Sequence, residues 1–181
     1  YHDEEWGVPC FDEHKMFEML ILEGAQAGLS WQTVLAKRET YRKAFDQFNV
    51  EKIAKYSEAK VQKLMLDAGI IRNQLKIRAA ITNAQALQTL RETAPRPEFA
   101  LTDFFWKYVD GKPKQNALKS RADIKATTPE SDALSKALKK AGFKFVGSTI
   151  VYAHMQACGM VNDHLTSCWR YEAVREMGRK L

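Results

Sequence analysis

The chain has 181 residues, of which 45% are hydrophobic, so it can bury a real core and is not expected to be disordered. Its formal net charge of +6 permits a polyanionic partner but does not require one. No apolar run approaches the roughly 20 residues that cross a bilayer, no signal pattern opens the chain, and three cysteines occur at irregular spacing, so we expect a cytoplasmic protein without membrane contact.

Hydrophobic periodicity predicts an all-α chain of about eight helices with no strand. An aromatic segment, residues 1–11, is expected to be an ordered loop before the first helix. The expected helices cover residues 13–24, 31–48, 57–69, 72–90, about 104–108, 131–140 and 148–158. Their expected N-caps are Asp12, Ser30, Ser57, Thr102 and Ser131. Residues 1–181 are expected to form one all-α domain, either as one body or as two lobes around a pocket, with the polar stretch 110–129 as a mobile or lobe-joining connection.

The stretch LEGAQAGLSW, residues 22–31, breaks the apolar pattern. Glu23 falls in one helical row with Met16, Leu20 and Ala27, so a carboxylate is predicted among apolar neighbours, where it needs a partner. Two glycines and a capping serine then bring Trp31 to the start of the next helix. On that helix, the basic residues around Arg38 are expected to face solvent.

A glycine turn between two helices is predicted at DAGIIRN. Gly69, Ile70 and Ile71 would present backbone N–H groups beside Arg72 and Lys76, which suits a DNA phosphate. The alternative is an ordinary helix connection with solvated basic residues, and the stretch alone favours that alternative.

His164 and Cys168 are four residues apart, which in a helical turn places both on one side, as two zinc ligands require. His2 is a possible third ligand, whereas Cys10 fits poorly because Gly7 and Pro9 intervene. The alternative is a surface histidine beside a buried free thiol. A zinc ion here would be structural, joining the two termini.

Tyr1, Trp6, Trp31 and Glu23 would together form a pocket with flat walls and one strong acceptor, as an extruded purine requires. The alternative is that the aromatic residues belong to the core and that Glu23 caps a helix or pairs with a base.

The blocks YHDEEWGVP, LEGAQAGLSW with TVL, DAGIIRN, FKFVGSTI and MQACGMVNDH closely resemble the 3-methyladenine DNA glycosylase I family of bacterial base-excision repair. The match runs in order from Tyr1 to Cys168 and leaves only a short basic tail. The resemblance implies a helix-hairpin-helix DNA glycosylase fold with a structural Zn²⁺ that joins the N- and C-terminal segments.

The same resemblance assigns roles to individual residues. It implies that Glu23 recognises the alkylated base, that Tyr1 and Trp6 line the pocket, that Trp31 stacks on the base, and that Leu29 is a wedge in the duplex. The turn residues Gly69, Ile70, Ile71, Arg72 and Lys76 are the implied DNA contacts. The implied zinc ligands are His2, His164, Cys168 and a cysteine before Tyr1.

Two departures from the wider helix-hairpin-helix group bear on the reaction. Ile71 replaces the second hairpin glycine, and Asn73 stands where bifunctional members carry a lysine, so no lyase activity is expected. Residues 77–98 contain no catalytic aspartate. N3-methylation makes the adenine cationic and its glycosidic bond weak. Glu23 is therefore expected to contribute more to recognition of the methylated adenine than to general acid or base catalysis.

The expected activity is monofunctional excision of 3-methyladenine from double-stranded DNA, in the bacterial cytoplasm, by a monomer that releases the free base. Two alternatives remain open on the sequence. One is a helix-hairpin-helix module that binds DNA lesions without turnover. The other is a zinc-stabilised helical protein that binds partners and has no salt-dependent DNA affinity.

Overall fold

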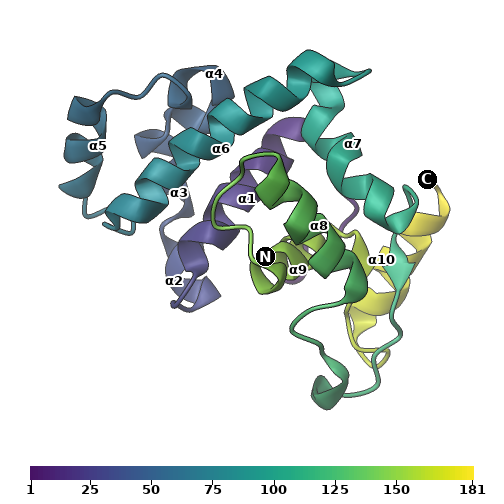
Figure 1. The fold of residues 1–181 in the computed structure, drawn as a ribbon. Coiled ribbons are helices and arrows are strands. Elements are labelled where there is room, and N and C mark those ends of the chain that lie inside the picture. Colours follow the sequence, from purple (N-terminus) through teal and green to yellow (C-terminus); the bar gives the residue numbers. More distant parts are fainter.

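The computed structural model describes residues 1–181 and confirms the all-α class (Figure 1). The α-helices are α1 (Glu13–Gln26), α2 (Trp31–Ala36), α3 (Arg38–Ala44), α4 (Val50–Ile53), α5 (Glu58–Met65), α6 (Gln74–Thr93), α7 (Ala100–Trp106), α8 (Pro129–Lys140), α9 (Ser148–Ala157) and α10 (Trp169–Arg179). The 3₁₀ helices are η1 (Asp46–Phe48), η2 (Pro97–Phe99), η3 (Lys107–Val109) and η4 (Arg121–Asp123). No helix has both the length and the apolar character to cross a membrane.

Helix α1 is the central element of the fold and contacts α2, α6, α7 and α9 (Figure 1). Its N-cap is Asp12, as predicted, whose side chain accepts a hydrogen bond from Lys15 N. Every residue from 16 to 25 is buried. A helix that is buried all round places its acidic residues, Glu18 and Glu23, inside the protein.

The predicted helix 31–48 is wrong as a single element, because it is divided into α2, α3 and η1. The first break lies at Lys37, and residues 46–48 all have positive φ. The break turns Arg38 inward, so this residue is buried and does not face solvent as predicted. Its guanidinium bonds the buried Glu18 carboxylate, and this ion pair explains why a charged residue lies inside.

Helices α5 and α6 form the predicted pair around the glycine turn. Ser57 caps α5 as expected, but the helix ends at Met65, four residues before Gly69. Helix α6 begins at Gln74, with Asn73 as its N-cap. The turn is therefore longer than the sequence indicated, because an asparagine cap starts the second helix more effectively than Arg72 does.

Three predictions about the C-terminal half need correction. Thr102 lies inside α7 and bonds Glu13 of α1, so it is not a cap. Helix α8 is capped by Thr128, with Ser131 bonding back to it in a capping box. The expected basic tail is helix α10, which buries Tyr171 and Val174.

A two-residue parallel pairing was also not expected. Strand β1 (Lys114–Gln115) pairs with β2 (Val161–Asn162), which ties the polar connection 110–129 to the segment after α9.

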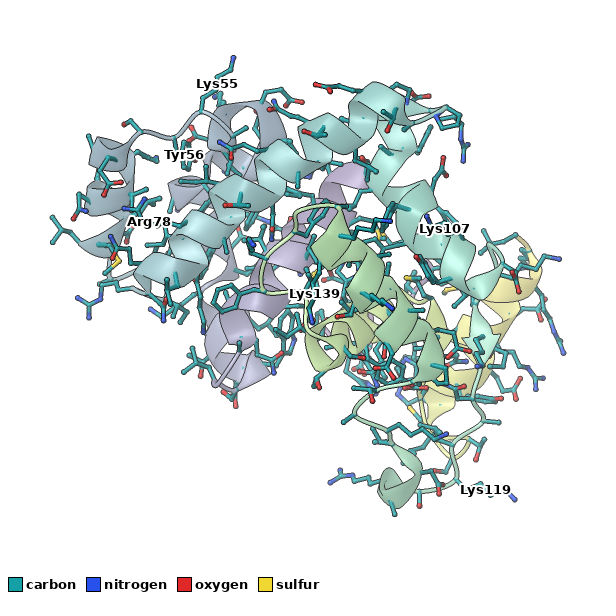
Figure 2. All side chains as sticks on the ribbon, viewed as in Figure 1. Lys55, Tyr56, Arg78, Lys107, Lys119 and Lys139 are labelled. Atoms are coloured by element: carbon teal, nitrogen blue, oxygen red, sulfur yellow. The ribbon has the colours of Figure 1, made fainter.

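Buried apolar side chains form one core cluster that runs from Cys10 to Val161 and includes residues of all helices from α1 to α9. The presence of two lobes around a pocket therefore stays a prediction. Exposed lysines are spread over separate elements of the surface, as Figure 2 shows for Lys55, Lys107, Lys119 and Lys139. Net charge alone therefore does not locate a DNA-binding face.

Candidate active site and metal centre

One cavity of about 220 Å³ brings together the four residues that the sequence placed in a pocket. Its lining consists of Tyr1, Trp6, Glu23, Gln26, Trp31, Ala153 and Gln156. Three elements that are distant in sequence contribute: the N-terminal loop, the end of α1 with the start of α2, and α9. Sequence reasoning missed Gln26, Ala153 and Gln156, although MQACGMVNDH contains the last of these.

Glu23 is the only acidic residue in the cavity lining, and 4% of its surface is exposed. The sequence predicted a partner for this buried carboxylate, but no protein group lies within hydrogen-bonding distance of it. Burial raises the pKa of Glu23 to about 8. Its position in the last turn of α1 also disfavours a negative charge, because the helix C-terminus is itself negative. At neutral pH the carboxyl group is therefore mostly protonated.

Tyr1 and Trp31 form adjoining aromatic walls. Their ring centroids are 5.4 Å apart, with an interplanar angle of 45°. Burial and the nearby Glu23 raise the pKa of the Tyr1 hydroxyl, which keeps the phenol neutral. Trp31 Nε1 is buried and has no hydrogen-bond partner. The pocket thus combines apolar faces with unpartnered polar atoms, as expected of a site for a planar polar ligand.

A buried ion network holds the N-terminal loop against the helices. Arg38 donates to both carboxylate oxygens of Glu5, at 2.7 and 2.8 Å, and its Nε donates to Glu18 of α1. The backbone N–H groups of Glu5 and Trp6 both bond the carbonyl of Tyr1. Two walls of the pocket are thereby connected to α1 and α3. No local pattern reveals this network, because its members are far apart in sequence.

The corner between α1 and α2 exposes Leu29. Gly28 has a φ of +78°, which L-residues rarely adopt, and Ser30 then caps α2 as predicted. Leu29 lies between them with 42% of its surface exposed. The position is compatible with the wedge that the sequence predicts.

Lys76 also lies at this corner between α1 and α2, and not beside Arg72 at the glycine turn. Its Nζ donates to the carbonyls of Ala25 and Ala27, at 2.8 and 2.6 Å, at the end of α1. These carbonyls have no intrahelical partner, so the ammonium group stabilises the helix terminus. Lys76 therefore supports the pocket corner, and its amine is already bound within the protein.

The glycine turn itself uses part of its backbone internally. Gly69 N–H bonds the Asp67 side chain, and Ile71 N–H bonds a tyrosine hydroxyl of α3. Ile70 is buried, while Arg72 is exposed. Ile70 N–H bonds the Asp67 carbonyl, so all three N–H groups that were predicted to face a phosphate are bonded within the protein. Arg72 is the exposed cation of the turn.

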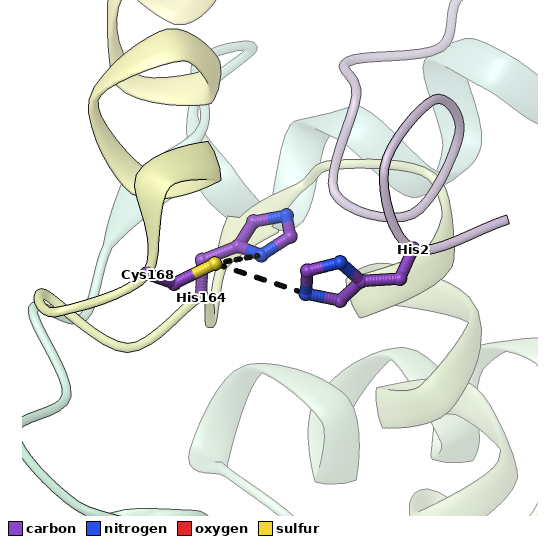
Figure 3. Close-up of side chains that lie close together, drawn as sticks. All are labelled: His2, His164 and Cys168. Carbon is purple, nitrogen blue, oxygen red and sulfur yellow. Dashed lines mark hydrogen bonds between the residues drawn. The ribbon is translucent and has the colours of Figure 1, made fainter.

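His2, His164 and Cys168 converge as predicted, and their ligand atoms all lie within 4.8 Å of one another (Figure 3). Cys168 Sγ is 3.8 Å from both His2 Nε2 and His164 Nδ1. Zinc bonds of about 2.0–2.1 Å to nitrogen and about 2.3 Å to sulfur place tetrahedral N and S ligands about 3.6 Å apart. Both N···S distances are close to this value, so the three side chains can hold a zinc ion after small side-chain movements.

Hydrogen bonds outside this group orient both imidazole rings. His164 Nε2 bonds the Trp6 carbonyl at 3.0 Å, and His2 Nδ1 bonds Asp3 at 2.8 Å. Each ring then directs its other nitrogen toward Cys168, the arrangement typical of metal-binding histidines. A Cβ at Gly7 would lie 3.0 Å from His164 Nε2, so only glycine leaves room for this ring.

One detail of the predicted metal site differs, whereas the judgement that Cys10 fits poorly is confirmed. His164 and Cys168 are not in one helical turn: His164 follows β2, and Cys168 is the N-cap of α10. The turn between them brings the side chains together instead. Cys10 is buried beside Cys158 in the core and does not belong to the group.

Comparison with known proteins adds independent information about this site. The family model for methyladenine glycosylases matches residues 1–171. DNA-3-methyladenine glycosylase 1 of Escherichia coli (strain K12) is 52% identical over 171 residues, which cover 94% of this chain and 89% of that protein.

Two solved structures are closely similar. A crystal structure of 3-methyladenine DNA glycosylase I superposes with a TM-score of 0.89 at 54% identity, covering 93% of this chain and 91% of the other. The enzyme from Staphylococcus aureus, solved to explain its recognition of 3-methyladenine, has a TM-score of 0.89 at 34% identity and covers 94% and 89% of the two chains.

Proposed function

Because this chain belongs to the methyladenine glycosylase family, we propose that it is a DNA-3-methyladenine glycosylase. It flips the damaged nucleotide out of double-stranded DNA, hydrolyses the N-glycosidic bond, releases 3-methyladenine and leaves an abasic site. The observation that carries this proposal is the cavity lined by Glu23, which has no hydrogen-bond partner, and by the adjoining rings of Tyr1 and Trp31.

The chemistry of the substrate matches this cavity. Methylation at N3 makes the adenine cationic and weakens its glycosidic bond, so the base departs without protonation by an acid. Aromatic faces stabilise a cation, and stacking contributes about 1–3 kcal/mol per base. Selective binding of the cation then supplies much of the rate.

In this proposal, Glu23 recognises the base by hydrogen bonds. In the free protein its neutral carboxyl group carries both an O–H donor and a carbonyl acceptor. The edge of adenine that carries N7 and the amino group offers one acceptor and one donor, which complement such a group.

The reaction stops at base release. Asn73 stands where a lysine nucleophile would be needed for lyase chemistry, and its side chain is occupied as the N-cap of α6. No residue with a nucleophilic side-chain amine lines the cavity.

The DNA contacts belong to the helix-hairpin-helix arrangement of α5 and α6. Gly69, Ile70 and Ile71 form the turn, Arg72 binds phosphate, and Leu29 fills the gap in the duplex. Lys76 contributes indirectly, by holding the end of α1 in place.

His2, His164 and Cys168 are proposed to bind a structural Zn²⁺, with a fourth donor from outside this group of three. When bound, the ion cross-links the N-terminal loop to the start of α10. The histidine rings are already oriented for it, and Trp6 is directly connected to the site through its carbonyl.

The deciding experiment measures free 3-methyladenine released from methylated duplex DNA by wild type and by Glu23→Gln. Wild type should release the base, and the variant should release it at least about tenfold more slowly while still binding DNA. If wild type binds the alkylated duplex but releases no base, the chain is a lesion-binding module and the proposal is wrong.

A further inference from the structure

Gln156 is another polar residue that lines the cavity, in addition to Glu23. It lies on α9, opposite the end of α1, and is half-buried. We propose that Gln156, oriented by Asp163, presents its side-chain carbonyl oxygen to the base and thereby selects purines with an amino group at C6 over purines with an oxygen there. This inference rests on the proposed excision of a purine from DNA.

Asp163 forms the centre of a buried hydrogen-bond network behind the pocket. It is 4% exposed and lies directly after β2. Its carboxylate accepts from the Tyr152 hydroxyl at 2.7 Å, from Gln156 Nε2 at 2.7 Å and from Asn116 Nδ2 at 2.6 Å. An ionised carboxylate has only acceptors, so each neighbour must present a donor to it.

This requirement determines the orientation of the Gln156 amide. Its NH₂ group is directed to Asp163, and its Oε1 accepts no hydrogen bond from the protein. Reversing the amide would place Oε1 against the carboxylate, where two acceptors repel each other. The position of the residue is also restrained, because its backbone carbonyl accepts from Gly7 N–H at 3.1 Å. The free Oε1 is therefore the acceptor that Gln156 can offer to the cavity.

Glu23 cannot supply this discrimination by itself. A neutral carboxyl group offers a donor and an acceptor, so it can accept from an amino group or donate to an oxygen by rotating its proton. As long as its NH₂ group bonds Asp163, the Gln156 amide keeps Oε1 in place and cannot exchange it for a donor. The 6-amino group of adenine carries two hydrogens, one for each of these residues, whereas the 6-oxygen of guanine would face the Gln156 oxygen. Sites that pair a specific polar group reject the mismatched analogue most strongly.

The test compares two lesions in one preparation of methylated duplex DNA. Single-turnover release of 3-methyladenine and 3-methylguanine is measured with excess enzyme for wild type, Gln156→Met and Gln62→Ala. Methionine has nearly the same length but cannot accept as an amide oxygen does, and Gln62 is an exposed glutamine of α5. The ratio of the two rates should fall about tenfold in Gln156→Met and stay unchanged in Gln62→Ala.

Because the ratio comes from one sample, it does not depend on the fraction of folded enzyme. If Gln156→Met slows both releases equally and leaves the ratio at its wild-type value, the residue is merely structural and the inference is overturned. If wild type releases neither base, the proposed function itself has failed, which is a distinct outcome.

The role of Asp163 is tested by a double-mutant cycle with Asp163→Ala. Without the carboxylate the Gln156 amide can rotate, so the single variant should lose part of the selectivity. Adding Asp163→Ala to Gln156→Met should then lower the ratio no further. Full additivity of the two changes, or wild-type selectivity in Asp163→Ala, would contradict positioning by Asp163. Should the aspartate variant fail to fold, the Gln156→Met result still decides the proposal.

Discussion

Glu23 is buried without a hydrogen-bond partner, a placement that costs stability and therefore indicates a function. Burial disfavours the charged form, and the last turn of α1 adds an unfavourable potential for a negative charge. A carboxyl group kept neutral in this way can act as donor and acceptor toward a base.

The same burial makes stability depend on pH. The pKa of Glu23 is raised from 4.5 to about 8 in the folded protein, so between these values the folded state holds a proton that the unfolded state has released. Stability from this residue is therefore lost as the pH rises through that window, by up to about 1.4 kcal/mol per pH unit. Glu23→Gln should gain stability relative to wild type from pH 5 to pH 8, measured by urea unfolding.

Glu92→Gln is the matched control, because Glu92 is an exposed residue near the end of α6. Its stability difference from wild type should not change over the same range. A stability difference for Glu23→Gln that is constant with pH would show that the carboxyl group titrates normally.

Leu29 has the exposure expected of a wedge, and its truncation should leave the fold almost unaffected. Unstacking a base step costs a few kcal/mol, so Leu29→Ala should slow release of 3-methyladenine from duplex DNA by about tenfold or more. Affinity for the free base, measured by calorimetry, should stay at the wild-type value. Leu181→Ala, another exposed leucine, should change neither quantity, and equal activity of Leu29→Ala and wild type would exclude the wedge.

At the scale of elements, two basic residues near the start of α6 have different roles. Lys76 binds the carbonyls at the end of α1, whereas Arg72 extends from the turn before α6 into solvent. Both are basic residues next to a predicted DNA-binding turn, but two backbone carbonyls hold Lys76, whereas Arg72 is exposed. Substitution of Lys76 should therefore change the stability of the protein, whereas substitution of Arg72 should change its affinity for DNA.

Lys76→Met should destabilise the protein by about 1–3 kcal/mol, because two carbonyls lose a charged donor. Arg72→Ala should leave the melting temperature unchanged but weaken DNA binding and reduce the slope of log K against log salt by about 1. Thermal unfolding and salt-dependent fluorescence anisotropy separate the two effects. A loss of stability in Arg72→Ala with an unchanged salt slope would reverse this assignment.

At the scale of the whole molecule, the two ends of the chain are joined beside the pocket. His2, four residues before Trp6, meets His164 and Cys168 across the fold (Figure 3). The network of Glu5, Arg38 and Glu18 fastens the same loop from the other side. Loss of either connection should therefore affect the pocket walls as well as overall stability.

His164→Ala should remove most of the bound zinc and lower the melting temperature, measured by elemental analysis and calorimetry of the intact protein. Prolonged chelation of wild type should produce a similar shift. His14→Ala is the control, since His14 lies outside the metal group. Unchanged metal content in His164→Ala would exclude this residue from the ligand set.

Local patterns in the sequence predicted much of the fold. Asp12, Ser30 and Ser57 do cap helices, and Glu23 is buried as its row of apolar neighbours indicated. These features are predictable because caps and helical faces depend on residues within one or two turns. The pairing of His164 with Cys168 was predicted from their spacing in a helical turn, but a non-helical turn before α10 brings them together, and His2 was predicted only from its ligand chemistry and the family resemblance.

Only the tertiary structure decided the partners of the polar groups. Arg38 was expected in solvent but bonds Glu5 and Glu18, Lys76 was expected at DNA but closes α1, and Gln156 gave no local signal at all. Each of these side chains pairs with a group far away in the chain, and its location depends on how whole helices pack. The sequence by itself indicated that Glu23 and three aromatic residues share one pocket, whereas packing decided which polar groups around it are held, which are free and in which direction they face.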